Sequence, residues 1–92
     1  RYDPDGGKAN GALLDEGTLH VARFDADGRG EWRALVHGRD GLTRTRGWLD
    51  QADVVIRARE AGDVVGGTRM DRTEWVAVAP TGEAYVTCTN NT

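Results

Sequence analysis

Large apolar side chains are scarce in this sequence, and their scarcity limits the kind of fold that it can form. Hydrophobic residues make up 38% of the chain, but eleven of them are alanine, and Leu, Ile, Val and Phe together number 17 of 92. That share lies just below the roughly 20% under which order becomes doubtful in highly charged chains. Because the net charge is only -3, we expect ordered structure that buries its apolar faces against further neighbours.

Length and charge narrow the class of protein further. A chain of 92 residues leaves room for one small domain or part of one. Eleven arginines and one lysine are scattered among fifteen acidic residues without a basic stripe, so nucleic acid is not an expected partner. No stretch reaches the roughly 20 apolar residues of a membrane span. The single cysteine, Cys88, excludes an internal disulfide, and the lack of serine excludes a serine nucleophile within these residues.

The first third of the chain has the pattern of short strands separated by glycine-containing turns. Residues 1–11 are rich in Gly, Asp and Pro and predict a loop rather than a helix or a strand. The segments GALL, TLHVARF and EWRALV follow, with near-alternating apolar residues in the later two and turns between them. This pattern predicts an antiparallel meander that is complete by residue 36.

The remainder predicts a helix followed by a second hairpin. Residues 37–47 contain three arginines and three glycines, which is typical of an exposed connection. Apolar spacing of three and four residues then predicts a helix from about residue 49, with Gly62 as its stop. After a polar connector at 68–73, EWVAVAP and AYVTCTN flank a turn at 80–83.

These elements indicate a mainly β fold with one helical insertion. We interpret the chain as one unit in three parts: a strand meander (1–36), a loop and helix (37–67), and a connector with a hairpin (68–92). Two sets of antiparallel strands that each end in a polar loop suggest a partial β-propeller of one to two blades. A blade without its neighbours exposes both faces, which agrees with the shortage of large apolar residues.

Several residues of metal-binding types have simpler structural interpretations. Asp25 and Asp27 resemble the start of a calcium loop, but the later ligands of such a loop are missing, and a hairpin turn is favoured. His20 and His37 have no second ligand at suitable spacing. Cys88 alternates with apolar residues on a predicted strand, so packing is favoured over metal ligation.

The motif MDRTEW contains the strongest candidates for chemistry. Arg72 and Glu74 are two residues apart, so an extended backbone would project both side chains from the same face. Arginine suits bidentate phosphate contact, and glutamate is a hard oxygen ligand, although a plain surface pair is the alternative. Asn90 and Asn91 directly follow the last predicted strand, where their carbonyl oxygens would ligate a cation or stabilise a turn.

Three segments together carry a resemblance to a known family. DGGKANGALLDEGTLHVARFDADGRGEW, GLTRTRGWLDQADVVIRAREAGDVVGGTRMDRTEW and TGEAYVTCTNN resemble consecutive parts of the PhoX-type bacterial alkaline phosphatases. The resemblance covers nearly the whole chain in order. Its most specific part is Asp71-Arg72-x-Glu74-Trp75, followed by the hairpin that ends in Thr89-Asn90-Asn91.

The resemblance implies a fold, a chemistry and a location. Members of this family are β-propellers whose central site holds calcium and iron, and they hydrolyse phosphate monoesters outside the cytoplasm. By resemblance, Arg72 would contact the substrate phosphate and Glu74 would ligate a metal ion. The parent protein would be periplasmic or secreted, with its signal upstream of Arg1. The chain itself would be a fragment that packs against the remaining blades and is inactive alone, because it lacks the other metal ligands.

The sequence also departs from the family pattern. Thr73 stands where the family usually has proline, and the family's iron-binding cysteine belongs to a different motif, so Cys88 does not inherit that role. Two other functions therefore remain open: a non-catalytic β-propeller or calcium-binding module, and an independent small adaptor domain.

Overall fold

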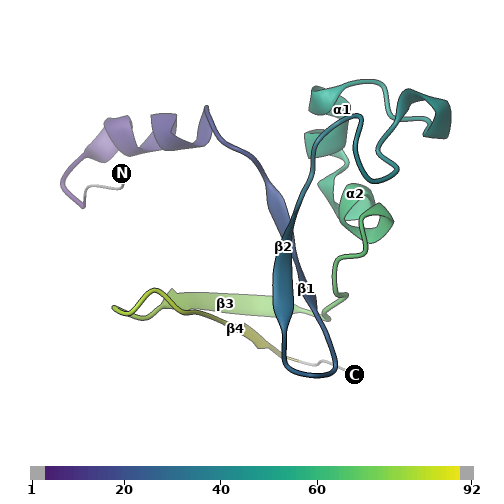
Figure 1. Cartoon of the computed structure of the whole chain (residues 1–92). Coiled ribbons are helices and arrows are strands. Elements are labelled where there is room, and N and C mark those ends of the chain that lie inside the picture. Colours follow the sequence, from purple (N-terminus) through teal and green to yellow (C-terminus); the bar gives the residue numbers. More distant parts are fainter. Residues whose placement is uncertain (1–3, 90–92) are drawn as a thin grey trace.

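The structure is a computed structural model that describes residues 4–89. Within this range, four strands form two separate antiparallel sheets of two strands each, β1–β2 and β3–β4. Figure 1 shows the β1–β2 hairpin between the helices and the N-terminal 3₁₀ helix, with β3–β4 running crosswise near its lower end. In chain order the elements are η1 (Gly7–Leu14), β1 (His20–Phe24), β2 (Gly30–Ala34), η2 (Arg44–Arg46), α1 (Gln51–Ile56), α2 (Ala58–Val64), β3 (Thr73–Val78) and β4 (Ala84–Cys88).

The N-terminal segment is helical, so two predictions for it are wrong. Both the end of the expected loop and the expected GALL strand lie in η1. Its turns are closed by local hydrogen bonds, from the Ala9 amide to the Gly6 carbonyl (3.1 Å) and from the Asp15 amide to the Ala12 carbonyl (3.1 Å). A strand needs a partner for its backbone groups, and these local bonds satisfy them instead. The predicted three-stranded meander is therefore a two-stranded hairpin.

The β1–β2 hairpin has the register that its turn residues impose. Val21 lies opposite Arg33, and Ala22 lies opposite Trp32. At the turn, the Asp25 amide donates to the Arg29 carbonyl at 2.7 Å, and Gly28 has a positive φ of 88°. Glycine adopts this left-handed conformation without the steric cost that other residues meet. The Asp- and Gly-rich sequence at 25–30 thus forms the predicted turn.

The segment between β2 and α1 is folded onto the helices rather than exposed throughout. Leu42 is fully buried, although the sequence predicted an exposed connection here. The His37 amide donates to Gln51 Oε1 at 2.7 Å, and its ring Nε2 lies 2.8 Å from the Trp48 carbonyl oxygen. Gln51 Nε2 donates in turn to the Leu35 carbonyl at 2.8 Å. These bonds hold both ends of the loop against the start of α1.

The helical insertion consists of two short helices, α1 and α2, instead of one. Asp50 begins α1 by accepting the Asp53 amide at 2.8 Å, as an N-cap aspartate does. The helix breaks at Arg57, whose φ and ψ are -99° and 37°. The Arg57 guanidinium lies 4.0 Å from the centre of the Trp48 ring. It also donates a hydrogen bond to the Glu60 carboxylate, and this bond is the main cause of the raised pKa of Arg57.

The predicted stop at Gly62 is wrong, because Gly62 lies inside α2 and the helix continues to Val64. Gly62 packs against Val21 of β1, and a Cβ at Gly62 would lie 3.5 Å from Val21 Cγ2. That distance is an ordinary van der Waals contact, so α2 passes close to β1 at this point without requiring glycine. No helix in the described part of the chain is long and apolar enough to cross a membrane.

The hydrophobic core lies in one corner of the molecule, where the end of β2, the following loop and the two helices meet. Val21 and Ala58 are partly buried against it. Its buried members are Leu35, Leu42, Trp48, Val54, Ala61 and Val65. This corner, residues 35–65, is called the helical corner below.

The β3–β4 hairpin has no comparable cover. It is antiparallel with a turn near Pro80, where the Ala79 amide donates to the Glu83 carbonyl at 2.8 Å. Every residue of β3 is exposed, and in β4 only Cys88 is partly buried. The exposed residues include large apolar side chains on both faces, among them Trp75, Val76, Val78, Tyr85 and Val86. A sheet that is apolar on both faces is typical of one packed between two layers.

The dimensions agree with this uneven packing. The radius of gyration is 15.4 Å, whereas a compact domain of this length has one of about 12 Å. Figure 1 shows the reason: η1 and β3–β4 both extend away from the helical corner. The described residues therefore form an open arrangement of small elements around one limited core.

Candidate functional site

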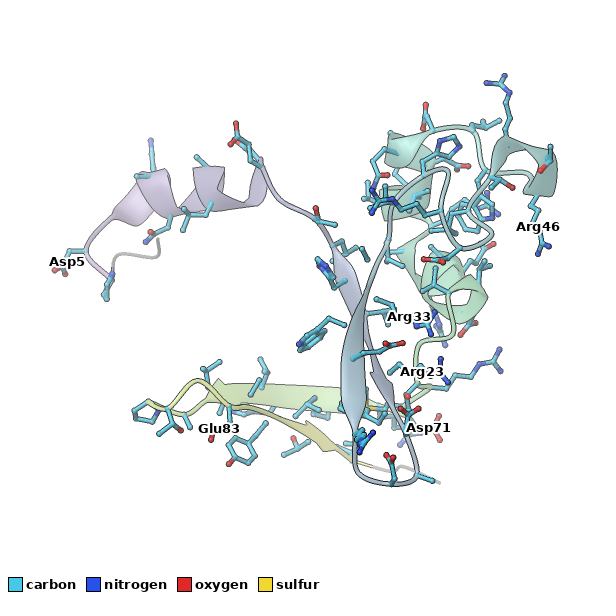
Figure 2. The ribbon with its side chains drawn as sticks, in the orientation of Figure 1. Asp5, Arg23, Arg33, Arg46, Asp71 and Glu83 are labelled. Atoms are coloured by element: carbon cyan, nitrogen blue, oxygen red, sulfur yellow. The ribbon has the colours of Figure 1, made fainter. Side chains whose placement is uncertain are left out.

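The candidate residues Arg72 and Glu74 lie where the chain enters β3. Figure 2 shows Asp71, which immediately precedes Arg72, at the point where the connector from α2 reaches β3, and Glu83 at the opposite end of the hairpin. Arg72 stands just before the first residue of β3, and Glu74 is the second residue of that strand. We call this end of the hairpin its base.

Arg72 has a left-handed backbone with φ of 50°. Among the described residues, it is one of two non-glycine positions with positive φ, the other being Asp40. Its carbonyl accepts the Thr89 amide at 3.1 Å, which extends the β3–β4 pairing by one bond. The expectation that an extended backbone places Arg72 and Glu74 on the same face is therefore wrong at Arg72.

Glu74 occupies an irregularity of the strand. Thr73 pairs with Cys88 and Trp75 pairs with Thr87, so Glu74 is the extra residue of a β-bulge. A bulge bends its strand and changes the direction of a side chain, and bulges are over-represented next to active sites. Two unusual backbone features thus fall on the two residues that the sequence selected, which is typical of functional sites.

Both side chains are available to an outside ligand. Arg72 and Glu74 are exposed, and within residues 4–89 neither side chain takes part in an ion pair or a hydrogen bond. An unpaired guanidinium retains all five donors for an anion, and an unpaired carboxylate retains both oxygens for a cation. The base of the hairpin thus presents the Arg72 guanidinium and the Glu74 carboxylate without pairing either with a described residue.

The other predicted positions near this end differ in what the structure describes. Cys88 is a free, partly buried thiol opposite Thr73, so it lies close to the base of the hairpin. Asn90 and Asn91 lie outside the described residues, and their role as ligands or turn residues stays a prediction. The described part of the chain contains no group of three or more His, Cys, Asp or Glu side chains arranged to hold a metal ion.

The aspartates of the first hairpin and the histidines have structural partners. The Asp27 carboxylate accepts the Arg29 amide at 2.9 Å, and the Asp25 carboxylate lies 3.4 Å from Arg23 Nε, so both serve the turn and its flanks. His20 Nδ1 lies 3.0 Å from the Thr18 carbonyl oxygen, and His37 holds the loop before α1. These contacts agree with the structural interpretations that the sequence favoured.

Two grooves of the described structure flank the connector that leads to Arg72. A polar groove of about 480 Å³ lies between α2, β1 and the connector, with Arg59, Asp63 and Arg69 in its walls. An apolar groove of about 500 Å³ lies between the two hairpins, with Phe24 and Tyr85 in its walls. Met70 lines both of them. The connector therefore lies between the two grooves and separates them.

Sequence reasoning treated this connector only as a polar link and missed its contacts. The Thr68 amide donates to the Ala22 carbonyl at 2.9 Å, and the Phe24 amide donates to Thr68 Oγ1 at 2.7 Å. The signal that was present is the pair Gly66-Gly67, which is typical of a helix end that turns the chain back. The partner strand was not evident, because it lies more than 40 residues earlier.

Comparisons with known proteins bear on the whole of this arrangement. A family model described as "Alkaline phosphatase PhoX" matches residues 1–92. Among solved structures, the chain is similar to Pseudomonas fluorescens PhoX in complex with vanadate, a transition state analogue, with 49% sequence identity and a TM-score of 0.83. That match covers 99% of this chain and 17% of the Pseudomonas chain. No curated protein matches the chain.

Proposed function

The chain belongs to the alkaline phosphatase PhoX family, and from this premise we propose that it supplies part of the active site of a longer enzyme that hydrolyses phosphate monoesters. In this proposal Arg72 binds the phosphoryl group and Glu74 binds a metal ion. The observation that carries it is the base of the β3–β4 hairpin, where a left-handed arginine and a bulged glutamate stand exposed and unpaired within the described residues.

The chemistry of Arg72 suits a phosphoryl group at each stage of hydrolysis. A guanidinium offers parallel N–H donors at a spacing that matches two phosphoryl oxygens. As charge develops on these oxygens in the transition state, a fixed cation stabilises it without reorganising. The similar Pseudomonas enzyme carries vanadate as a transition state analogue. An arginine positioned for such a group would bind the phosphoryl oxygens both in the substrate and in the transition state.

The donor chemistry of Glu74 fits a hard cation. A carboxylate is the usual protein ligand of calcium, and it also suits ferric iron. When bound, such ions neutralise phosphoryl oxygens and lower the pKa of a coordinated water. Since residues 4–89 gather no three His, Cys, Asp or Glu side chains at one point, Glu74 would need further ligands from other segments of the enzyme.

We also propose that the rest of the enzyme forms a β-propeller around these residues. The support is the β3–β4 hairpin, which is apolar on both faces and exposed on both. Neighbouring blades would cover those faces and bring their own ligands to the base of the hairpin. From the family resemblance we also propose that the enzyme is periplasmic or secreted and that it binds both calcium and iron.

The test is substitution at both positions in the full-length phosphatase that carries this sequence. We expect Glu74→Gln to lower p-nitrophenyl phosphate hydrolysis at least about 100-fold and to lower the bound metal content, because an amide is a weaker ligand. Arg72→Ala should lower kcat/KM by about 100- to 1000-fold. Metal content is measured by elemental analysis and activity by steady-state kinetics.

Matched controls come from residues of the same types outside the base of the hairpin. Glu83→Gln changes an exposed carboxylate at the far end of the same hairpin, and Arg46→Ala changes an exposed arginine of η2. Both should retain nearly full activity. Unchanged turnover in Glu74→Gln would refute the assignment of the site, and an inert wild-type enzyme would favour the non-catalytic propeller instead.

A further inference from the structure

The connector that leads to Arg72 starts from a helix end with a defined geometry. The Gly67 amide donates to the Gly62 carbonyl at 2.8 Å, and the Gly66 amide donates to the Asp63 carbonyl at 3.2 Å. With Gly66 at a positive φ of 87°, these bonds form a Schellman motif at the end of α2. The chain is thereby turned back toward β1.

This helix end is packed directly on β1. A Cβ at Gly67 would lie 2.6 Å from Val21 Cγ2 and 3.0 Å from the Gly62 carbonyl oxygen, distances that no side chain tolerates without movement. Val21 is β-branched and stiff, so it cannot easily move aside. Glycine at position 67 therefore permits an approach to β1 that a residue with a Cβ could not make without displacing its neighbours.

Thr68 then fastens the connector to the outer edge of β1. The backbone groups of Leu19 and Asp25 form hydrogen bonds toward β2. Because the backbone groups of successive residues in a strand point to alternate edges, those of Ala22 and Phe24 point to the edge of β1 that faces away from β2. Thr68 bonds to both of them: its amide donates to Ala22, and its hydroxyl accepts from Phe24. The pattern is that of one parallel β-bridge in which a hydroxyl replaces the usual carbonyl acceptor.

The backbone after Thr68 is not required to continue along β1. The reason is that the Thr68 side chain, and not its carbonyl, accepts the hydrogen bond from the Phe24 amide. The backbone instead reaches Arg72, whose carbonyl accepts the Thr89 amide at 3.1 Å. Arg72 thus lies between two anchors, and its left-handed backbone needs such anchors because it is intrinsically unfavourable.

We infer that Thr68 is a positioning residue whose hydroxyl sets the location of the Arg72 guanidinium. The inference rests on the proposed function, in which Arg72 binds the phosphoryl group. Thr68 does not contact the substrate. It acts through the short segment between Thr68, which is anchored on β1, and Arg72. A small misplacement of the Arg72 guanidinium would lower catalysis.

The test uses the full-length phosphatase with Thr68→Val, which keeps the shape of the side chain and removes the hydroxyl. We expect kcat/KM for p-nitrophenyl phosphate to fall about 3- to 10-fold and inhibition by inorganic vanadate to weaken by a similar factor. Thr68→Ser should restore both, since it keeps the acceptor. Thr45→Val, which removes a hydroxyl bonded to Thr43 in the loop of η2, should change neither.

A double-mutant cycle connects Thr68 to Arg72 itself. If Thr68 acts through the guanidinium, Thr68→Val should have little further effect in an Arg72→Ala background. Full additivity, failure of Thr68→Ser to restore vanadate inhibition, or wild-type kinetics in Thr68→Val would each overturn the inference while leaving the proposed function intact. An inert wild-type enzyme would overturn the proposed function and the inference with it.

Discussion

The helical corner and the β3–β4 hairpin differ in how much apolar surface they bury and in which candidate site residues they carry. The helical corner contains the six buried hydrophobic residues of the described structure and holds its loop with the side chains of His37 and Gln51. The hairpin buries none of its large side chains, and it carries Arg72 and Glu74 at its base. Local stability therefore lies in one region, and the candidate chemistry lies in the other.

This division teaches how the site depends on its surroundings. An isolated two-stranded hairpin is at best marginally stable in water. The β3–β4 hairpin is tied to the rest of the described chain through the connector that Thr68 anchors, and its faces need further cover. The match spans 17% of the similar Pseudomonas protein, and under the proposed function the rest of the enzyme would supply that cover. Three substitutions compare the two regions directly.

The largest effect is expected from Leu42→Ala in the helical corner. Leu42 is fully buried, so its truncation leaves a cavity and should lower the free energy of unfolding by about 2–5 kcal/mol. Leu49→Ala is the control, since Leu49 is 61% exposed in this chain, and where no other segment of the full-length protein covers it the change should cost less than about 0.5 kcal/mol. Denaturant unfolding of the full-length protein measures both. Equal effects would mean that the helical corner is not the stabilising region.

A smaller effect is expected from Val78→Thr in the hairpin, and it distinguishes a covered face from a bare one. Val78 is 69% exposed in this chain. If other blades cover it in the full-length protein, the added hydroxyl should lower the free energy of unfolding by about 1–3 kcal/mol. The measurement is again denaturant unfolding. A change below about 0.5 kcal/mol would contradict the proposal that this face is buried by the rest of the enzyme.

The smallest effect is expected at the tip of the hairpin. The Thr81 hydroxyl donates to the Glu83 carboxylate, and this bond lowers the pKa of Glu83. A lowered pKa in the folded state stabilises the turn above the pKa of the unfolded chain, and this contribution is lost as the pH falls through the folded value. Thr81→Val should therefore raise the pKa of Glu83, as measured by NMR titration of the 92-residue chain. An unchanged pKa would show that the bond does not form in solution.

The extent to which the sequence predicted the fold differs between these regions. The β1–β2 and β3–β4 hairpins follow from alternating apolar residues and Gly-containing turns, and both pairings are present. The GALL segment was wrongly predicted as a strand, because four apolar and small residues do not reveal whether a partner exists. The helix was predicted without its break at Arg57, where the structure places the guanidinium over the Trp48 ring and beside Asp53 and Glu60.

The candidate site was likewise predicted only in part. Residue type and resemblance selected Arg72 and Glu74, but neither could predict the left-handed backbone or the bulge that directs them. Both features arise from the pairing of β3 with β4 and from the approach of the connector. Thr68 was missed for the same reason, since its partners on β1 are 44 and 46 positions away.

The sequence by itself determined the composition that favours burial against neighbours, the positions of the hairpin turns, and the residue types available for phosphate and metal binding. These properties are local, because they depend on side-chain chemistry and on the conformational preferences of a few adjacent residues. Only the tertiary structure decided that Gly67 and Thr68 join the end of α2 to the edge of β1, and that this junction fixes where Arg72 stands. Contacts between distant segments depend on shape and distance in three dimensions, which no short stretch of sequence specifies.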